Sequence, residues 1–271
     1  MPALTVTIIA RDEADRIGDA IRSVAFADEV LVLDSGSRDD TSAIARGLGA
    51  RVIETDWPGY VAQKNRAVEA ASNDWVFGLD ADERVSDELG RELRAWRSGG
   101  APAAAGFQVG RLTWWMGAPI RHGAWWPDRR VRLFDRRRGC WDGHDPHDYV
   151  RVQGSIGALH GLLHHHPYRD LREHLSTIER YSAIHAQGAR SRGERARWVD
   201  LLVRPPAYLL KALFWKRGVM DGARGLCLAF LGAAAVSLKW TRLLLEEGAG
   251  GETESRPRAE RSVTALDRVD R

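Results

Sequence analysis

The chain has 271 residues, of which 44% are hydrophobic and 28% are charged, and its 40 Lys and Arg against 37 Asp and Glu give a formal net charge of +3. This composition is typical of a globular protein with one large domain, or one domain and an appendage. It excludes a collagen-like chain, a disordered chain poor in aliphatic residues and, with only two cysteines, a small disulfide-stapled protein. The lone thiols and the lack of a basic stretch before the first apolar run predict a cytoplasmic protein.

Short apolar, β-rich runs alternate with helical patterns from Leu4 to Leu79. The predicted strands are 4–10, 29–33, 51–54 and 75–79, and the predicted helices between them are 14–25, 41–48 and 60–71. We expect Asp39 or Asp40 to cap the second helix, and a further helix from Ser86 to the Gly99-Gly100 break. This alternation predicts an α/β fold, with a parallel sheet and helices on both of its faces.

The second half of the chain changes character twice. Short strands and turns from Gly106 to about His166 predict an antiparallel extension of the sheet, with 131–134 as its clearest strand, and a helix is predicted over 168–190. From Trp198 to Leu245 the chain is apolar and basic and is broken by Pro205-Pro206. Its uncharged run, 226–238, is shorter than the roughly 20 residues that cross a bilayer. The region reads equally as an interfacial membrane helix or as a buried amphipathic hairpin.

Acidic side chains follow the predicted strands at their carboxyl ends, where open α/β sheets bind ligands. Asp12 and Glu13 follow the first strand, Asp34 ends the second, and Asp80-Ala81-Asp82-Glu83 ends the fourth. Like charges gathered in one cleft are costly unless a cation or hydrogen-bond donors lie among them. The pattern therefore predicts a metal site, and oxygen ligands suit Mg²⁺ or Mn²⁺. A D-x-D pair alone reads more readily as a solvated turn, but its place after the fourth strand favours the metal site.

Other nucleotide-binding motifs are missing from the sequence. No G-x-G-x-x-G follows the first strand, which disfavours a dinucleotide fold, and no G-x-x-x-x-G-K-[ST] occurs, which excludes a P-loop NTPase. The segment Asp34-Ser35-Gly36-Ser37 is typical of a turn in which the Asp34 side chain accepts hydrogen bonds from nearby backbone amides. Alternatively, Asp34 accepts a hydrogen bond from a base or ribose. Lys64 either meets a phosphate or solvates a helix face, and its spacing alone favours the solvated face.

Eight segments, in their order along the chain, carry a family resemblance. They are LTVTIIARDEADRIGDAIRSV, EVLVLDSGSRDDT, YVAQKNRAVEAA, DWVFGLDADERVSDEL, WWPDRRVRLFDRR, HDPHDYV, LLHHHPYRDLREHL and GVMDGARGLCLAF. The first four resemble the donor-binding half of family-2 glycosyltransferases with the GT-A fold, and the others resemble its lipopolysaccharide core β-glucosyltransferases. The resemblance covers about residues 4–245.

The resemblance implies a fold and a division into domains. It implies a mostly parallel GT-A sheet flanked by helices, as in nucleotide-diphospho-sugar transferases, with an amphipathic helical C-terminal extension. We expect a GT-A domain over 1–166, with a donor half over 1–100 and an acceptor half over 101–166. A helical, membrane-associating region would follow over 167–247, and a disordered tail over 248–271.

The resemblance also implies roles for the residues that match family motifs. Glu13 and Asp34 would hold the base and ribose, and Asp82 would ligate the metal together with His165. The expected nucleotide-sugar contacts are Ala10, Arg11, Glu13, Asp34, Ser35, Gly36, Lys64, Asn65, Asp80 and Ala81. Since three consecutive histidines cannot share one face of a strand, at least one of His164, His165 and His166 is expected to lie on the surface.

The implied reaction is a single displacement at the anomeric carbon of a UDP-sugar, expected to be UDP-glucose, with inversion. An acceptor hydroxyl attacks while UDP leaves, Mg²⁺ or Mn²⁺ neutralises charge on the leaving phosphate, and a carboxylate takes the acceptor proton. We choose Asp148 as this general base because His147-Asp148 matches the family's His-acidic pair, and Asp142 and Asp145 remain candidates.

The expected partners are a nucleotide-sugar donor, a lipid-linked saccharide acceptor such as the lipopolysaccharide inner core, and the inner face of the cytoplasmic membrane, to which the protein would be peripheral. The basic stretch Arg129 to Arg138 suits phosphorylated glycolipid or anionic membrane, or is a solvated face, and no nucleic acid is expected. Trp114-Trp115 and Trp125-Trp126 would stack on acceptor sugars or fill a core, with one of each pair expected in the core.

Two other functions stay open on the sequence. A polyprenyl-phosphate glycosyltransferase would share the donor site, but its acceptor would attack through a phosphate oxygen that needs no strong base. A non-catalytic module would bind a nucleotide-sugar or anionic lipid without transfer.

Overall fold

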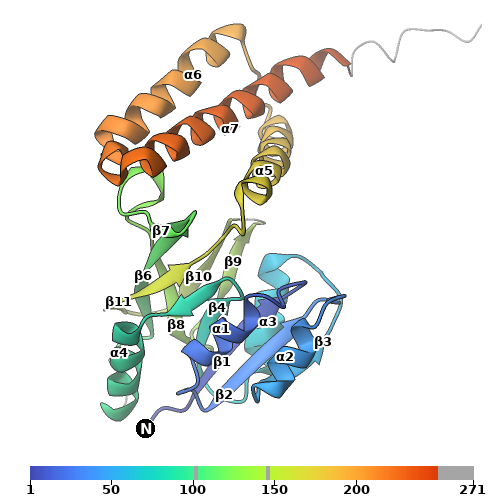
Figure 1. Ribbon diagram of the computed structural model, residues 1–271. Helices are drawn as coiled ribbons and strands as arrows, with labels where there is room; N and C mark the ends of the chain where they lie inside the picture. The colour runs from blue at the N-terminus through green and yellow to red at the C-terminus, as the bar shows by residue number, and fades with distance from the viewer. Residues whose placement is uncertain (101–102, 145–146, 250–271) are drawn as a thin grey trace, which may run out of the picture. The chain divides into compact units, whose positions relative to one another are not determined.

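The computed structural model describes residues 1–100, 103–144 and 147–249 (Figure 1). The chain divides into two compact units, the first formed by 1–173 with 212–229 and the second by 174–211 with the residues from 230 onward. The segment 212–229, which the sequence assigns to the C-terminal helical region, therefore packs with the first unit. The predicted disordered tail lies outside the described residues from 250 onward.

The first part of the first unit alternates strand and helix as predicted. The elements are β1 (Leu4–Ala10), α1 (Ile17–Ser23), β2 (Glu29–Asp34), α2 (Thr41–Gly47), β3 (Arg51–Glu54), α3 (Tyr60–Ala70), β4 (Trp75–Asp80), β5 (Glu83–Val85) and α4 (Asp87–Ser98). Ser86 caps α4, because its hydroxyl accepts a hydrogen bond from the Leu89 amide at 3.2 Å. At the start of α2 it is the Asp39 carboxylate that accepts, from the Thr41 amide at 3.1 Å.

The rest of the first unit adds strands and a hairpin. They are β6 (Gly106–Trp115), β7 (Ala118–Pro119), a 3₁₀ turn (Gly123–Trp125), β8 (Arg129–Asp135), β9 (Gly139–His144), β10 (His147–Val152) and β11 (Ile156–His165). Over the described residues, nine strands form one sheet along the path β3-β2-β1-β4-β8-β6-β11-β5, with β7 beside β6, and β9 and β10 form a separate hairpin.

The predicted antiparallel extension is only partly correct. Strand β8 runs antiparallel to both β4 and β6, whereas β11 pairs with β6 in parallel. The hairpin β9-β10 allows this direction, because it intervenes between β8 and β11 without joining the main sheet. The parallel arrangement brings the carboxyl ends of β6 and β11 together, since Thr113 pairs with His165.

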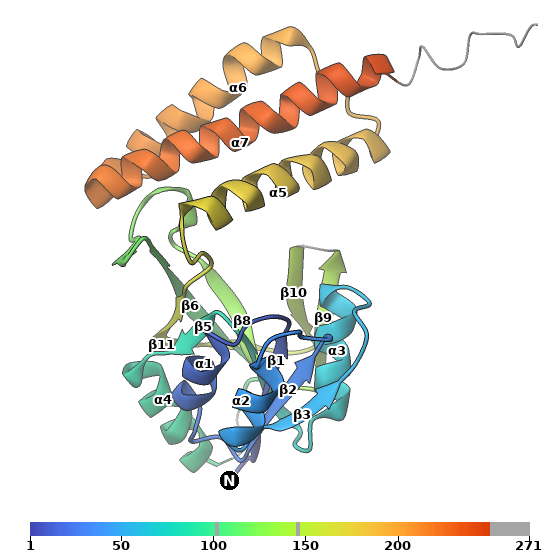
Figure 2. The same cartoon turned by 45° about the vertical axis from the view of Figure 1, so that its right-hand side comes forward.

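The sheet is covered on both faces, as the alternation predicts (Figures 1 and 2). On one face, Leu4, Val6 and Ile8 of β1 share a buried cluster with Ile17 of α1 and Leu89 of α4. On the other face, α3 and the β9-β10 hairpin share a second cluster, which holds Val68, Ala71, Val76, Phe134, Trp141 and Val150. Close packing in the two clusters holds the ends of the strands in place, so side chains at that edge of the sheet have fixed positions.

Close packing of β4 against the hairpin requires a glycine. A Cβ atom on Gly78 would lie 2.6 Å from the Trp141 ring, which is closer than real Cβ atoms approach their neighbours. Gly78 therefore lets Trp141 cover β4 directly beneath the strand end that carries Asp80.

The second unit is helical. Its elements are α5 (Leu171–Ser191, from residue 174), α6 (Trp198–Leu210) and the latter part of α7 (Gly222–Ala249). A buried cluster of Ala189, Ala196, Trp240 and Leu243 holds them together. The predicted break at Pro205-Pro206 is wrong, because α6 continues through both prolines. Proline already has a helical φ, and Pro205 is buried, so packing offsets the lost backbone hydrogen bonds.

The apolar run 226–238 belongs to a longer apolar helix than the run alone suggests. By length and composition, the helix Gly218–Leu245 is able to cross a membrane, with a mean hydropathy of 1.5 and 17% of its most apolar window buried. It is the one such helix among the described residues.

Candidate active site

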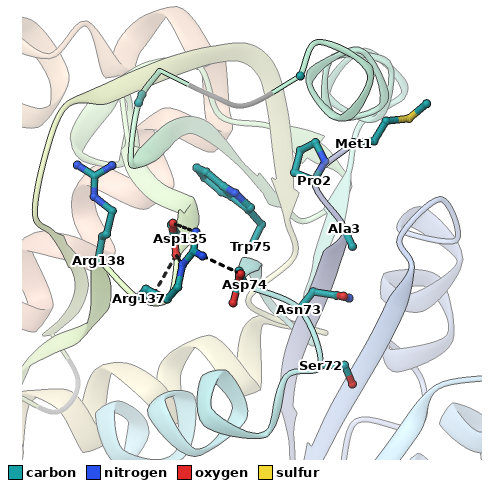
Figure 3. Close-up of a pocket in the computed structure, with 12 residues that line it drawn as sticks. Met1, Pro2, Ala3, Ser72, Asn73, Asp74, Trp75, Asp135, Arg137 and Arg138 are labelled. Carbon is teal, nitrogen blue, oxygen red and sulfur yellow. Dashed lines mark hydrogen bonds and ion pairs between the residues drawn. The ribbon is translucent and has the colours of Figure 1, made fainter.

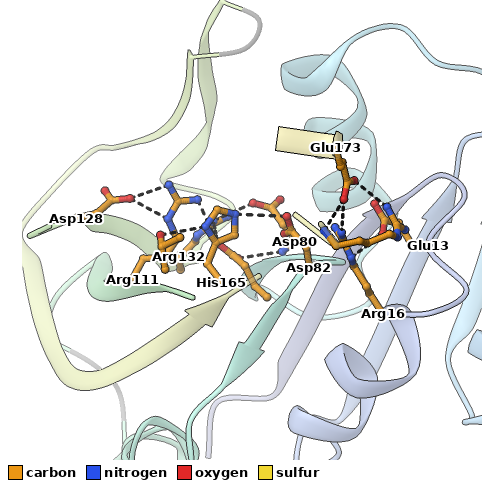
Figure 4. A network of polar contacts seen from close by, with 12 residues as sticks. Glu13, Arg16, Asp80, Asp82, Arg111, Asp128, Arg132, His165 and Glu173 are labelled. Carbon is orange, nitrogen blue, oxygen red and sulfur yellow. Dashed lines mark hydrogen bonds and ion pairs between the residues drawn. The ribbon is translucent and has the colours of Figure 1, made fainter. Parts of the chain in front are cut away.

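Strands β1, β2 and β4 end at the same edge of the sheet, here called the carboxyl edge. The register pairs Ala10 with Asp34 and Ile9 with Asp80, so the acidic strand ends lie side by side. This confirms the predicted convergence of carboxylates. Figure 4 shows Asp80 and Asp82, at the end of β4, within a network of polar contacts that includes Arg132 and His165.

Lys64 of α3 joins two of the predicted site residues. Its Nζ lies 2.8 Å from Asp80 Oδ1 and 2.7 Å from Asp148 Oδ2, and 4.4 Å from the centre of the Trp141 ring. Lys64 is buried, so it does not solvate a helix face. Burial opposes the charge on Asp80, but Lys64 and Arg132 more than compensate and hold the pKa of Asp80 well below its usual range.

Arg132 of β8 is a central residue that the sequence analysis counted only within a basic stretch. Its guanidinium bonds Asp80 Oδ2 at 2.9 Å and Glu83 Oε1 at 2.6 Å. Glu83 is fully buried and lies 3.5 Å from Arg111, which in turn bonds Asp128 at 2.7 Å. Burial opposes the charge on Arg132, but Glu83 and Asp80 raise its pKa above the usual value. In the sequence, the one sign of its role is that Arg132 falls at a position of the alternating strand whose side chain faces the core.

Asp82 and His165 meet beside this network. His165 Nε2 lies 3.4 Å from Asp82 Oδ2, while its Nδ1 lies 3.3 Å from the Thr113 hydroxyl. Both side chains remain partly accessible, 23% for Asp82 and 16% for His165. Burial opposes the charge on Asp82, but His165 outweighs it and lowers the pKa of that carboxyl.

The Asp82 and His165 pair fits a divalent cation that shares its ligands with a substrate. A carboxylate oxygen and an imidazole nitrogen suit Mn²⁺, and Mg²⁺ also accepts the carboxylate. No group of three or more His, Cys, Asp or Glu side chains placed to hold a metal occurs in the part of the chain that the structure describes. The remaining positions would therefore fall to water and to substrate phosphates, as is usual for Mg²⁺ sites.

The other two histidines of the triplet pack against Trp114, so the expectation of a histidine on the surface is wrong: all three are half-buried. His166 stacks on the Trp114 ring with 5.7 Å between centroids, and His164 lies 5.6 Å from the same ring. Burial, and then the charge of Arg84, lowers the pKa of His166 to about 4. Burial also lowers the pKa of His164. These two histidines are neutral packing partners at neutral pH.

Glu13 lies in a second cluster at the carboxyl edge, visible at the right of Figure 4. Arg169 lies 3.1 Å from Glu13 and 2.7 Å from Asp15, and Arg16 lies 3.1 Å from Glu173. Burial raises the pKa of Glu13 to about 7 in spite of both arginines. The segment after β11 is thus tied to the loop after β1.

The remaining predicted nucleotide contacts line the same edge but are engaged locally. Asp34 is buried and accepts from the Ser37 amide and the Ser42 hydroxyl, both at 2.7 Å. Ser35 accepts from Gln63 at 3.0 Å, and Gly36 has a φ of +79°, as its turn requires. Asn65 both donates to and accepts from the Trp141 backbone at 2.9 Å, which fixes the hairpin. Ala10 and Ala81 are buried, and Arg11 is exposed.

A pocket of about 330 Å³ opens beside His165. It is lined by Arg111, Thr113, Ala124, Trp125, Pro127, Asp128, Arg130, His165, Pro167 and Tyr168. The rings of Trp125 and Tyr168 lie 6.2 Å apart, and the Arg130 guanidinium bonds Asp128 at 2.9 Å. Trp115 is a core residue as expected, whereas both Trp125 and Trp126 are half-buried, so the expectation of one core member fails for that pair.

The basic stretch 129–138 is not one solvated face. Arg136 donates to the carbonyl of Ala71, the residue that follows α3, and Arg138 donates to the Gln153 carbonyl. Among the candidate bases, Asp142 pairs with Arg151 at 3.1 Å, and Asp145 lies outside the described residues. Asp148 is the candidate that the structure joins to the D-x-D segment, through Lys64.

A larger pocket, of about 690 Å³, lies at the opposite edge of the sheet, where β1 and β4 begin (Figure 3). Arg137 there lies 2.9 Å from Asp74 and 2.6 Å from Asp135. None of the predicted site residues lines this pocket, so its size does not mark the active site.

Comparison with known proteins gives three findings. The sequence model described as "Glycosyl transferase family 2" matches residues 5–151. The lipopolysaccharide core biosynthesis glycosyltransferase LpsC of Rhizobium meliloti (strain 1021) is 30% identical, over 86% of this chain and 91% of its own length. An uncharacterized glycosyltransferase of Rickettsia typhi is also 30% identical, over 90% of this chain and 87% of its own length. A solved structure of glucosyl-3-phosphoglycerate synthase from Mycobacterium tuberculosis, with Mn²⁺, UDP and glucosyl-3-phosphoglycerate, is 25% identical over 42% of this chain and 44% of its own, with a TM-score of 0.34.

Proposed function

The chain belongs to glycosyl transferase family 2, and we propose that it transfers glucose from UDP-glucose to a lipid-linked saccharide such as the inner core of lipopolysaccharide. The observation that carries the proposal is the Asp82 and His165 pair beside a pocket with aromatic and cationic walls. The likeness to LpsC supports the acceptor class.

The donor diphosphate would lie at the carboxyl edge, next to Asp82 and His165. These two side chains would hold Mg²⁺ or Mn²⁺. When bound, the cation would neutralise the negative charge on the leaving diphosphate. Asp80 would meet the nucleotide from a fixed position, because Lys64 pairs with one of its carboxylate oxygens and Arg132 with the other. Glu13 and the turn at Asp34 would meet the base and ribose.

The acceptor would occupy the pocket lined by Trp125 and Tyr168. Aromatic rings stack on sugar rings, and arginine forks pair with phosphate or carboxylate groups. Among the side chains that line the pocket, Arg111 and Arg130 pair with one carboxylate, Asp128, while Glu83, which also pairs with Arg111, is fully buried and does not line it. The lining arginines therefore outnumber the lining carboxylate. Such a wall suits an acceptor saccharide that carries anionic substituents.

Asp148 would act as the general base. Lys64 Nζ lies 2.7 Å from its Oδ2 and would hold the carboxylate in place to take the proton of the attacking hydroxyl. The anomeric carbon then bonds to the acceptor oxygen as its bond to the UDP oxygen breaks, and the configuration inverts.

The first experiment is a calorimetric titration of UDP into the protein with Mn²⁺ and with a chelator. We expect micromolar binding that needs Mn²⁺ and is lost in Asp82→Ala but retained in Asp74→Ala, an exposed acid of the opposite edge. Metal-independent binding, or equal loss in both variants, would contradict the proposed donor site.

The second experiment tests the base. In Asp148→Asn we expect kcat to fall by about 10²–10⁴ while UDP affinity changes little, because the asparagine cannot take the proton but keeps an oxygen for Lys64, whose ion pair with Asp80 remains. Asp142→Asn, which removes the other described candidate, is the control and should keep its turnover. Near-normal turnover in Asp148→Asn would instead favour an acceptor that attacks through a phosphate oxygen, such as a polyprenyl phosphate.

The site would work at the inner face of the cytoplasmic membrane. The apolar helix Gly218–Leu245 is mostly exposed, and lysines and arginines surround it. A peripheral enzyme of this kind would meet a lipid-linked acceptor at the surface where the lipid resides.

A further inference from the structure

One segment of the first unit exposes large apolar side chains close to the pocket loop. This aromatic turn, residues 212–221, comprises the end of a π-helical turn (Lys211–Trp215) and a 3₁₀ turn (Gly218–Asp221). Its exposed fractions are 65% for Phe214, 83% for Trp215, 48% for Val219 and 63% for Met220. Such a concentration of large apolar side chains is far more than the scattered exposure of an ordinary surface.

The charges around the aromatic turn are cationic. Lys216, Arg217 and Arg224 are exposed, while the one acid of the turn, Asp221, has a side chain only 9% exposed. The surface offered to a partner is therefore aromatic and basic. Tryptophan and phenylalanine flanked by lysine and arginine are the side chains that enter the interface of an anionic bilayer, where the rings lie among the headgroups and the cations meet lipid phosphates.

The turn has a fixed shape beneath this surface. Ala212 and Leu213 are buried. A Cβ atom on Gly218 would lie 2.6 Å from the Ala212 carbonyl oxygen, and one on Gly225 would overlap the Gly218 carbonyl oxygen. Only glycine fits at either place, so the exposed rings project from a closely packed base.

Asp221 joins this turn to the loop that forms the pocket. Its carboxylate accepts from the backbone amide of Arg121 at 3.1 Å, from the amide of His122 at 2.8 Å, and lies 3.0 Å from His122 Nδ1. The Gly123 amide donates to the Lys216 carbonyl at 2.8 Å. The next residues along the loop, Ala124 and Trp125, line the pocket beside His165.

We propose that the aromatic turn inserts into the surface of an anionic phospholipid bilayer, and that Asp221 acts as a positioning residue that transmits this contact to the pocket loop. The membrane surface is thereby held next to the pocket that would receive the lipid-linked acceptor. In that respect the inference rests on the proposed function, but the lipid contact itself is independent of it.

Vesicle binding tests the first half. Full-length protein is sedimented with vesicles of phosphatidylcholine mixed with anionic phosphatidylglycerol, and with pure phosphatidylcholine vesicles. We expect Phe214→Ser with Trp215→Ser to weaken binding to the anionic vesicles at least tenfold, whereas Ile156→Ser, an exposed apolar residue of β11, changes it less than twofold. Equal binding of the double variant and the wild type would overturn the proposal.

Hydrogen exchange tests the second half. Binding of the anionic vesicles should slow exchange over both 212–221 and 121–125 in the wild type. In Asp221→Asn we expect the slowing over 212–221 to remain and that over 121–125 to be smaller than in the wild type, since the Gly123–Lys216 hydrogen bond is kept, with vesicle affinity within about twofold. An undiminished response of 121–125 in Asp221→Asn would overturn the coupling, and so would its absence from the wild type.

UDP binding separates this inference from the proposed function. All of these variants should bind UDP with Mn²⁺ as the wild type does, because the substituted residues belong to the aromatic turn or to the start of β11, and none is a proposed donor contact. Loss of UDP binding in the wild type would refute the donor site yet leave the vesicle result standing. If Asp221→Asn alone lost UDP binding, that variant would have a general folding defect. The hydrogen-exchange test would then use Asp221→Glu, which keeps the carboxylate and should keep the response of 121–125 to vesicles.

Discussion

The two edges of the main sheet both carry aspartates paired with arginines, yet they differ in burial. At the carboxyl edge, Arg132 is 4% exposed and shared by Asp80 and Glu83. At the opposite edge, Arg137 is 62% exposed beside Asp74 and Asp135. Exposed ion pairs contribute little, whereas a buried charge that loses its partner is costly. The same residue types therefore make a rigid site at one edge and an ordinary surface at the other.

The largest expected effect comes from removing the buried cation. Arg132→Met removes the nearest cation of the fully buried Glu83 and one of the two cations that pair with Asp80, and leaves only Arg111 at 3.5 Å from Glu83. We expect the free energy of unfolding to fall by about 3–5 kcal/mol. Arg137→Met should lower the free energy of unfolding far less, because the Arg137 pairs are exposed to solvent. Urea unfolding of the two variants measures the difference. Similar losses would show that burial does not distinguish the two edges.

A smaller effect is expected from the histidine at the carboxyl edge. His165→Ala should weaken Mn²⁺-dependent UDP binding by about 10- to 100-fold, because it removes a proposed metal ligand. His164→Ala, on the opposite face of β11, should leave that affinity unchanged. Titration of UDP into both variants checks this, and equal losses would assign the effect to strand packing instead.

The smallest expected effect is a pH dependence set by Glu13. Its native pKa of about 7 lies above its unfolded value of 4.5, so the native state keeps a proton that the unfolded state releases between these pH values. The stability linked to Glu13 is thus complete below pH 4.5 and is lost as pH rises to about 7. We expect a loss of roughly 1–2 kcal/mol after solvent screening.

Glu13→Gln isolates this contribution, because the amide does not titrate. The free energy of unfolding should fall less from pH 5 to pH 8 in the variant than in the wild type. His166 has a lowered pKa of about 4, so its contribution makes the free energy of unfolding rise with pH. This contribution is the same in the wild type and in Glu13→Gln, so it cancels in the difference between them. Parallel pH profiles would rule out Glu13 as the titrating group.

The spacing of apolar residues along the sequence predicts the strands and helices of the first part of the chain. Strands 4–10 and 51–54 have the predicted bounds, and the carboxylates at the strand ends converge because parallel strands must end together. The direction of β11 was not predictable in this way, since it depends on pairing with β6, from which β8 and the hairpin separate it along the chain. The prolines of α6 likewise mislead, because packing outweighs local propensity.

The polar network was the least predictable part of the site. Arg132 and Glu83 are 49 residues apart, and Arg169 and Glu13 are 156 apart. Sequence spacing has no signal for such pairs, and an arginine within a basic run looks solvated. Asp148 was chosen on resemblance, and its contact with Lys64 places it near Asp80, while its role as a base stays a prediction.

The pairing of β11 with β5 has a consequence for biosynthesis. His165 is opposite Glu83 in that pairing, and the His166 amide donates to the Asp82 carbonyl at 2.8 Å. The D-x-D segment thus leaves the ribosome well before the histidine that faces it, because β6, β8 and the β9-β10 hairpin are all synthesised in between. A nascent chain halted before Ile156 would have a nearly complete nucleotide rim and lack one of the two proposed metal ligands. Docking of β11 would make the enzyme competent only when synthesis has passed His165.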